Sequence, residues 1–425
     1  MRIYLSSLGC KLNQSEMDTL AARLARVGHQ VVPSPTEAEL CVFNTCAVTH
    51  VAAQKSRQAL RRLHRDNPDA RLVVTGCYAE LAPEELRDLP GVERVAGNEA
   101  KERLAELLAG EGADPVPPLA PPVPRARTRA LVKIQDGCDN ACTYCIIHVA
   151  RGRQRSHPPD QVLAEIQGLL AAGHQEIVLT GVHIGAYGRD RGGGDQDPDL
   201  WALVARILAD TDVPRLRLSS IEPWDLPERV LSAWEDPRLC RHLHLPLQSG
   251  SDAILQRMAR RYTTAEYARL VSAARAAIPD LAVTTDVIVG FPGETDAEFT
   301  ESLAFVQEME FARVHVFPYS LRPGTPAAGM ADQIPPPVRA ERARAMRTVA
   351  AASSRTFHRQ FVGRTVEVLW ESSRAGPGDP VWSGLTDNYL RVRAASPQDL
   401  ANRFTSARLM AVAGDGLMGE IGQGA

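Results

Sequence analysis

The sequence lacks any long hydrophobic run and has no large excess of either charge. No segment approaches the ~18 consecutive apolar residues of a membrane-spanning helix, so we expect no membrane partner. The segment before Cys10 lacks the long apolar stretch and the cleavage site of a signal peptide, which favours a cytoplasmic protein. The formal net charge of −3 excludes a protein that is basic throughout.

Cysteine is scarce in this chain of 425 residues, and its spacing is uneven. The length exceeds what one hydrophobic core usually serves, so we expect two or three domains. In a chain of this length without a secretory signal, the eight cysteines are not expected to form a disulfide framework. Three of them are clustered and the rest are dispersed: Cys138, Cys142 and Cys145 against Cys10, Cys41, Cys46, Cys77 and Cys240. This distribution indicates metal binding.

Residues 1–112 alternate strand-like and helix-like segments, which predicts an α/β domain with a parallel sheet. Cys10, Cys46 and Cys77 each follow a predicted strand, and the carboxyl ends of parallel strands lie along one edge of a sheet. These three cysteines can therefore converge in space. Cys41 lies within a strand and is predicted to be a small buried hydrophobic residue. The strands are expected at 2–8, 40–44 and 71–75, and the helices at 15–27, 55–64, 84–89 and 101–108.

Three further segments follow. Six prolines between 111 and 129 predict a linker at 113–128. The segment 129–357 predicts a partial (βα)6 barrel, with the glycine-rich loop 192–198 as a surface insertion. Residues 358–425 predict a small β-barrel with turn residues at 414–420. The barrel strands are expected at 130–135, 176–180, 215–219, 242–246, 283–289 and 313–317, and the last β-segments at 363–370, 381–386 and 389–394.

The strongest motif is the C-x3-C-x2-C run formed by Cys138, Cys142 and Cys145 directly after a predicted strand. Three thiolates can hold a [4Fe–4S] cluster and leave one iron without a protein ligand. That iron can chelate the amino and carboxylate groups of S-adenosylmethionine (SAM). The alternative is a structural zinc loop, but zinc takes four ligands and the nearest further candidate is His148.

With Tyr144 before its last cysteine, this run resembles the signature of the radical SAM superfamily. The whole chain resembles the methylthiotransferase family of these enzymes, which implies an N-terminal cluster-binding domain, a radical SAM barrel and a C-terminal TRAM barrel. His148 stands where the family usually has proline, and we interpret it as a loop substitution. The resemblance is carried by the segments 9–14, 44–48, 75–77, 134–138, 150–153, 179–185, 248–251 and 290–294.

Within the family, the sequences of segments 9–14, 134–138 and 179–185 are similar to those of the branch that acts on N6-threonylcarbamoyladenosine at position 37 of tRNA. The resemblance implies that one SAM methylates sulfur held by a second cluster. A radical from another SAM then removes hydrogen from C2 of the adenine, which accepts the methylthio group. Two alternatives stay open: a methylthiotransferase for another tRNA adenosine or a ribosomal protein, and a non-catalytic iron–sulfur RNA-binding protein.

The resemblance assigns Cys10, Cys46 and Cys77 to a second [4Fe–4S] cluster, as their strand-end positions also suggest; unrelated buried cysteines are the alternative. It names no catalytic residue beyond the cluster ligands, and Cys240 is interpreted as structural. SAM-binding roles are expected at Tyr144 for the adenine, Thr180 and Gly181 for the methionyl amino group, Glu222 for ribose or ammonium, Gln248 after the fourth strand, and Gly290 and Gly293, whose turn is equally compatible with a plain turn.

Two basic segments and the last domain are candidates for RNA contact. Five basic residues and no acid lie between Lys55 and Arg65, and seven arginines face one glutamate between Arg339 and Arg364. Solvated helix faces are the alternative for each. The expected RNA contacts are Lys55, Arg57, Arg61, Arg391 and Arg393, with Trp370, Trp382 and Tyr389 as aromatic candidates. Core packing is the alternative for the two tryptophans. The expected partners are tRNA, a sulfur source and an electron donor such as flavodoxin or ferredoxin.

Overall fold

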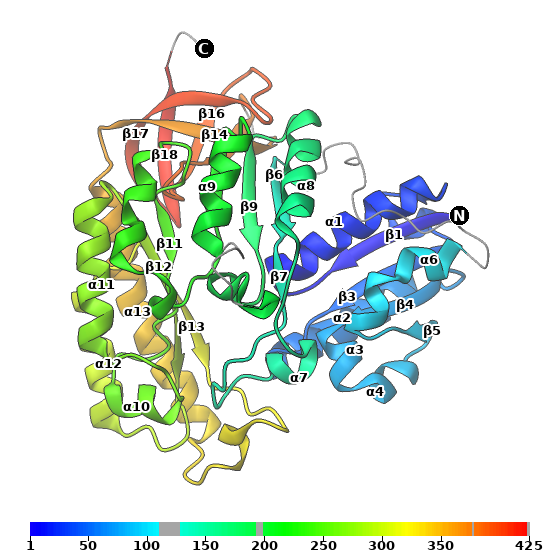
Figure 1. Ribbon diagram of the computed structural model, residues 1–425, viewed down its shortest axis with the longest axis horizontal. Helices are drawn as coiled ribbons and strands as arrows, with labels where there is room; N and C mark the ends of the chain where they lie inside the picture. Colours follow the sequence, from blue (N-terminus) through cyan, green and yellow to red (C-terminus); the bar gives the residue numbers. More distant parts are fainter. Residues whose placement is uncertain (110–127, 193–198, 376–377, 423–425) are drawn as a thin grey trace.

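The structure, a computed structural model, describes residues 1–109, 128–192, 199–375 and 378–422. The expected linker and the glycine-rich loop fall almost entirely outside these residues. Among the described helices, none is long and apolar enough to cross a membrane. Figure 1 shows the N-terminal domain on the right, the six-stranded barrel on the left and the C-terminal barrel above it.

The N-terminal domain is a parallel five-stranded sheet in the order β2-β1-β3-β4-β5. All six residues of the central strand β3 are buried because helices cover both faces. Leu20 and Leu24 of α1 pack on one face, and Leu60 and Leu63 of α2 on the other. The expected α/β architecture is confirmed, although the helix predicted at 101–108 is split in two. The elements are β1 Arg2–Ser7, α1 Lys11–Arg26, β2 Gln30–Val31, β3 Leu40–Thr45, α2 His50–Asp66, β4 Arg71–Gly76, α3 Cys77–Leu81, α4 Pro83–Arg87, β5 Val92–Val95, α5 Asn98–Glu102 and α6 Leu104–Ala109.

The second unit is a partial barrel of six parallel strands. Two three-stranded sheets, β10-β9-β6 and β11-β12-β13, are joined by bridges from Leu216 to Leu239 and from Ser220 to His244. The predicted partial barrel is confirmed. Its elements are β6 Arg129–Lys133, α8 Pro159–Ala171, β9 Glu176–Thr180, α9 Leu200–Asp210, β10 Arg215–Leu218, the 3-10 helix Glu228–Glu235, β11 His242–His244, α10 Asp252–Arg257, α11 Thr264–Ala277, β12 Ala282–Val289, α12 Asp296–Glu308, β13 Arg313–Pro318 and α13 Pro336–Arg359.

A short hairpin frames the cysteine loop of this barrel. Strand β7 (Gln135–Asp136) pairs antiparallel with β8 (Arg155–Ser156), and helix α7 (Ile147–Arg151) lies between them in sequence. The C-x3-C-x2-C run therefore occupies a loop that leaves and returns at one place.

The C-terminal domain is a closed five-stranded barrel in the order β14-β15-β16-β18-β17. Trp370 is fully buried in its core, and its Nε1 donates to Thr405 Oγ1 at 2.7 Å. The small β-barrel is thus confirmed, but the prediction of a turn over 414–420 was wrong beyond residue 415, because the chain there pairs back as β18. The strands are β14 Thr365–Arg374, β15 Val381–Leu385, β16 Arg391–Ala395, β17 Phe404–Ala413 and β18 Gly416–Ile421.

The loop between β15 and β16 locks the two barrels together. Tyr389 in this loop stacks on His242 with ring centroids 4.6 Å apart, and its hydroxyl accepts a hydrogen bond from Arg129 at 3.2 Å. Arg217 is fully buried, pairs with Glu176 at 2.7 Å and donates to the carbonyls of residues 386 and 387. The amino ends of the barrel strands are therefore closed by the C-terminal domain.

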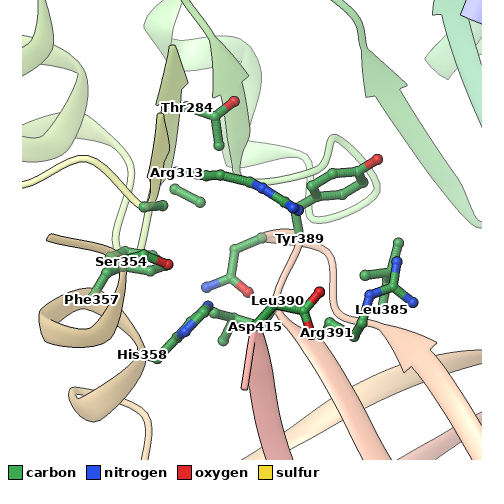
Figure 2. A pocket seen from close by; sticks show the side chains of 13 residues that line it. Thr284, Arg313, Ser354, Phe357, His358, Leu385, Tyr389, Leu390, Arg391 and Asp415 are labelled. Atoms are coloured by element: carbon green, nitrogen blue, oxygen red, sulfur yellow. The ribbon is translucent and has the colours of Figure 1, made fainter. Parts of the chain in front are cut away.

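A small cavity remains at this junction. Figure 2 shows Arg313 from the six-stranded barrel, Phe357 and His358 from α13, and Tyr389 and Asp415 from the C-terminal domain around it. Its volume of about 80 Å³ has room for a few water molecules and none for a nucleoside. This end of the barrel is therefore closed to a ligand of that size.

Candidate active site

The first cysteine set, Cys138, Cys142 and Cys145, lies in the loop between β7 and α7. Gly137 starts this loop with a φ of 69°, and a Cβ at that position would lie 2.0 Å from the carbonyl oxygen of Arg153. Glycine is therefore required for the turn. Burial, followed by the nearby thiols of Cys142 and Cys138, raises the pKa of Cys145 to about 12. The three thiols thus share one environment; they are called the loop triad below.

The second set, Cys10, Cys46 and Cys77, lies where β1, β3 and β4 end side by side. Gly9 has a φ of 114°, and a Cβ there would lie 2.9 Å from Cys46 Sγ, so only glycine lets these two segments approach. Burial raises the pKa of Cys46 to about 11, with smaller contributions from Cys77 and Cys10. The convergence expected from the strand ends is present; this set is called the sheet triad.

A structural zinc site is the alternative to a cluster at each set of cysteines. Two sulfur ligands of one zinc ion lie at most ~4.6 Å apart, because each Zn–S bond is about 2.3 Å long. Among the described residues, neither triad forms a group whose donor atoms all lie within 4.8 Å of one another. His148 is exposed on α7 and joins no such group. Neither triad, as placed in the structure, therefore has the compact spacing that a zinc ion requires.

Glu222 and Arg260 form an ion pair beside the loop triad. Arg260 Nη1 lies 3.2 Å from Glu222 Oε1, Nη2 bonds the other carboxylate oxygen, and Nη1 also reaches Cys142 Sγ at 3.6 Å. The Arg260 guanidinium lies over the ring of Trp224, 4.8 Å from its centroid. Glu222 is thus near the cluster, as expected, but its carboxylate is already engaged. Sequence reasoning missed Arg260 because it stands in a loop outside every recognised motif.

A second charged group beside the loop triad is His183. Its Nε2 lies 2.5 Å from Asp225 Oδ2. Burial lowers the pKa of His183, but hydrogen bonds to Asp225 and Cys138 outweigh it and raise the pKa to about 9. A positive imidazolium therefore lies beside the Cys138 sulfur at neutral pH. His183 belongs to the 179–185 motif. The sequence therefore marked this residue but did not indicate its role beside the cysteines.

Two of the residues expected to bind SAM lie next to the start of the cysteine loop. Thr180 ends β9 and Gly181 follows it, and a Cβ on Gly181 would lie 2.8 Å from the carbonyl oxygen of Gln135. Gln135 Oε1 accepts the backbone N–H groups of residues 182 and 183 at 3.0 and 2.8 Å. This fixes the backbone after β9 against the start of the cysteine loop.

The other expected SAM contacts come from neighbouring strand ends. Tyr144 packs on the apolar cluster that contains Phe291 and Tyr319. Gln248 has a φ of 65°, an unusual backbone conformation for a non-glycine residue. Gly290 and Gly293 also have positive φ, and Arg339 and Arg342 of α13 and Arg257 of α10 surround their turn. Their contact with SAM stays a prediction.

Three polar side chains on the inner face of the barrel were missed from the sequence. His244, Asp286 and His315 lie on the adjacent strands β11, β12 and β13, with donor atoms within 4.8 Å of one another. His244 Nδ1 bonds Thr284 Oγ1 at 2.9 Å, which directs Nε2 towards Asp286 at 3.4 Å. Each of the three lies on a different strand, so their spacing in the sequence did not indicate that they meet.

The expected RNA contacts differ in whether other side chains of the described protein already hold them. Lys55 and Arg61 are exposed on α2 and have no ion pair within the described residues. Arg57 is held by Tyr78 and by Glu85 at 3.5 Å. Arg391 and Arg393 pair with acids of their own barrel, Glu371 at 3.9 Å and Asp415 at 2.5 Å. Trp370 and Trp382 are buried and so follow the core alternative, whereas Tyr389 closes the base of the barrel by stacking on His242.

Two family profiles match the chain: the radical SAM superfamily over residues 132–306 and the uncharacterized protein family UPF0004 over residues 2–97. A threonylcarbamoyladenosine tRNA methylthiotransferase MtaB from Bacillus subtilis is 36% identical over 96% of this chain and 93% of its own length. The chain belongs to the radical SAM methylthiotransferase family. MtaB of Thermotoga maritima is 35% identical over 98% of the chain and 96% of its own length. A tRNA-2-methylthio-N(6)-dimethylallyladenosine synthase from Geobacillus kaustophilus is 34% identical over 99% of the chain and 82% of its own length.

Solved structures place this methylthiotransferase fold among radical SAM proteins. The methyltransferase TsrM from Kitasatospora setae, solved with cobalamin and a [4Fe-4S] cluster, aligns with a TM-score of 0.56 at 18% identity over 77% of both chains. The cobalamin-dependent enzyme OxsB aligns with a TM-score of 0.50 at 12% identity, over 82% of this chain and 56% of its own. At these identities the likeness concerns the fold alone, and it supports the partial barrel.

Proposed function

We propose that this methylthiotransferase adds a methylthio group to C2 of N6-threonylcarbamoyladenosine at position 37 of tRNA. The observation that carries the proposal is the presence of two cysteine triads, one at the strand ends of the N-terminal sheet and one in the loop between β7 and α7 of the barrel. The names of the relatives at 35–37% identity support the substrate. The dimethylallyladenosine synthases at 33–34% identity give the alternative substrate.

The cofactors in this proposal are two [4Fe–4S] clusters and SAM, with the loop triad and the sheet triad as ligands. A cluster with three protein thiolates has one open iron, which supplies a site for SAM and an electron at the loop triad, and a site for sulfur at the sheet triad. Arg260 and the His183 imidazolium offset the negative charge of the Cys142 and Cys138 thiolates.

We assign the four segments 1–112, 113–128, 129–357 and 358–425 to a cluster-binding domain, a linker, the radical SAM domain and a TRAM-like RNA-binding barrel. The further partners in this proposal are an electron donor such as flavodoxin or ferredoxin, and a sulfur source. An aromatic C–H has no acidic proton for base catalysis, which is why the reaction requires a radical and a reductant.

The substrate assignment is tested by offering two tRNAs to the reconstituted enzyme, one with threonylcarbamoyladenosine and one with dimethylallyladenosine at position 37. We expect the methylthio derivative of the first at least ~10-fold faster, since a site built around a polar substituent loses its hydrogen bonds with an apolar one. Nucleoside mass spectrometry measures both products. Product only on the dimethylallyl tRNA would assign that substrate instead, and product on neither tRNA would exclude both.

We expect the Lys55→Glu/Arg61→Glu double variant to bind tRNA about tenfold more weakly at moderate salt, because two phosphate contacts are lost and reversed. Arg57 is left unchanged because it holds Tyr78 and Glu85. Filter binding over a salt series gives the affinity and its slope. The matched control is Arg229→Glu/Arg269→Glu, the same charge change at exposed outer positions of the barrel. Equal affinities for both double variants would remove α2 from the RNA surface.

A further inference from the structure

Arg151 is buried at the boundary between the N-terminal domain and the six-stranded barrel. It ends α7, and only 1% of its side chain is exposed. Its Nη1 donates to Glu16 Oε1 at 2.8 Å and to Asp136 Oδ1 at 2.9 Å, and its Nη2 donates to Asn13 Oδ1 at 2.7 Å. Glu16 and Asn13 belong to α1, whereas Asp136 belongs to the barrel hairpin. One guanidinium therefore holds both domains.

On the N-terminal side, this contact leads to the strand ends of the sheet triad. Asn13 Nδ2 donates to the carbonyl oxygen of Leu8 at 2.9 Å and to that of Thr45 at 3.0 Å, just before Cys10 and Cys46. Asn13 Oδ1 also lies 3.7 Å from Cys10 Sγ. The group that Arg151 bonds is thus the one that holds two of the three cysteine-bearing segments in place.

On the barrel side, the same contact closes the loop triad. Asp136 comes two residues before Cys138, and Arg151 comes six residues after Cys145, so their ion pair joins the two ends of the cysteine loop. Asp136 Oδ1 also accepts the N–H of Gly137 at 2.8 Å. A movement of Arg151 would therefore shift both ends of this loop together.

Both carboxylates also have an ammonium partner of their own. Glu16 pairs with Lys101 at 2.5 Å, and Asp136 lies 3.3 Å from Lys133. Removal of the guanidinium therefore leaves neither carboxylate without a cation, and the fold should survive. What is lost is the planar fork that bonds three acceptors in fixed directions, which a single ammonium cannot reproduce.

We propose that Arg151 is a positioning residue that fixes the separation and orientation of the two cysteine triads. The inference rests on the proposed function, because the separation matters only where sulfur held at one triad must meet a carbon radical generated at the other. A misplacement of about 1 Å in such a pair can reduce the rate a hundredfold. Burial of the fork between two domains provides the rigidity that this role demands.

The first test needs no cofactor and no substrate. In the apoprotein of the Arg151→Met variant, the amide hydrogens of residues 14–18 and 149–152 should exchange about tenfold faster than in the wild type, because these segments lose their shared contact. Arg151→Lys keeps the charge and should show a smaller increase in the same amides. The matched control is Arg217→Met, another fully buried arginine between two domains, which should accelerate exchange at 386–390 and not at 14–18.

The second test uses the reconstituted protein. Arg151→Met should still bind about eight iron atoms, and it should make 5′-deoxyadenosine while forming methylthio product about a hundredfold more slowly. The magnetic coupling between the two reduced clusters, seen by electron paramagnetic resonance, should change in Arg151→Met and be partly restored in Arg151→Lys. Unchanged exchange and unchanged coupling in the folded Met variant would overturn the positioning role. A wild-type protein that forms no methylthio product would overturn the proposed function and leave the exchange result valid.

Discussion

Replacement of Cys10, Cys46 and Cys77 by alanine is expected to abolish the methylthio product while SAM is still cleaved. The sheet triad lies just after the ends of β1, β3 and β4 in the N-terminal domain, and the loop triad that is expected to bind SAM is on the barrel. With a strong reductant, the variant should make 5′-deoxyadenosine and leave the tRNA unmodified. Chromatography of 5′-deoxyadenosine and mass spectrometry of tRNA nucleosides measure the two outcomes.

The control for this variant is Cys41→Ala in the same domain. Cys41 is fully buried in β3 and belongs to no triad, so its replacement tests the effect of a lost thiol on folding alone. It should cost some stability and keep both activities. Circular dichroism should show that the triple variant is folded, because some loss of 5′-deoxyadenosine is expected if the domain loosens. Methylthio product at the wild-type rate from the triple variant would end the two-cluster proposal.

Replacement of Cys138, Cys142 and Cys145 by alanine has the complementary expected result. Anaerobic reconstitution should load about four iron atoms in place of about eight, because one set of three ligands remains. SAM cleavage should fall to background, since no open iron is left in the barrel. Iron analysis and 5′-deoxyadenosine formation are the measurements.

The corresponding control is Cys240→Ala. Cys240 is buried two residues before β11 and belongs to neither triad, so its replacement tests the loss of a buried thiol alone. This variant should keep its iron and its cleavage activity. A loop-triad variant that retained all its iron would show that the ligands were wrongly assigned, and a protein that bound RNA without ever cleaving SAM would favour the non-catalytic alternative.

The two triads could be predicted from the sequence because local rules place them. Three cysteines within eight residues are close in any fold, and Cys10, Cys46 and Cys77 follow parallel strands whose ends must share an edge. The same reasoning gives the α/β domain and the partial barrel. It holds even where an element was misjudged, such as the split helix after β5.

The charged groups around the triads could not be predicted in this way. Arg260 is 38 residues from Glu222, and Arg151 is 135 residues from Glu16, so neither pair leaves a pattern of spacing. The C-terminal barrel shows a related limit: Trp370 looks the same in the sequence whether it faces RNA or the core. Only the closure of the barrel by β17 and β18 decides that it is inside.

The seal that Tyr389 makes at the base of the six-stranded barrel has a consequence for how an RNA would be held. A domain on a flexible tether raises the local concentration of its ligand but lets it sample many orientations. Here the C-terminal barrel is fixed to the six-stranded barrel by the buried Arg217–Glu176 pair and by the stacked Tyr389 ring. An RNA bound by this domain would be held in one orientation and at one distance from the cysteine triads. That fixed distance would determine which nucleotide reaches the site of the reaction.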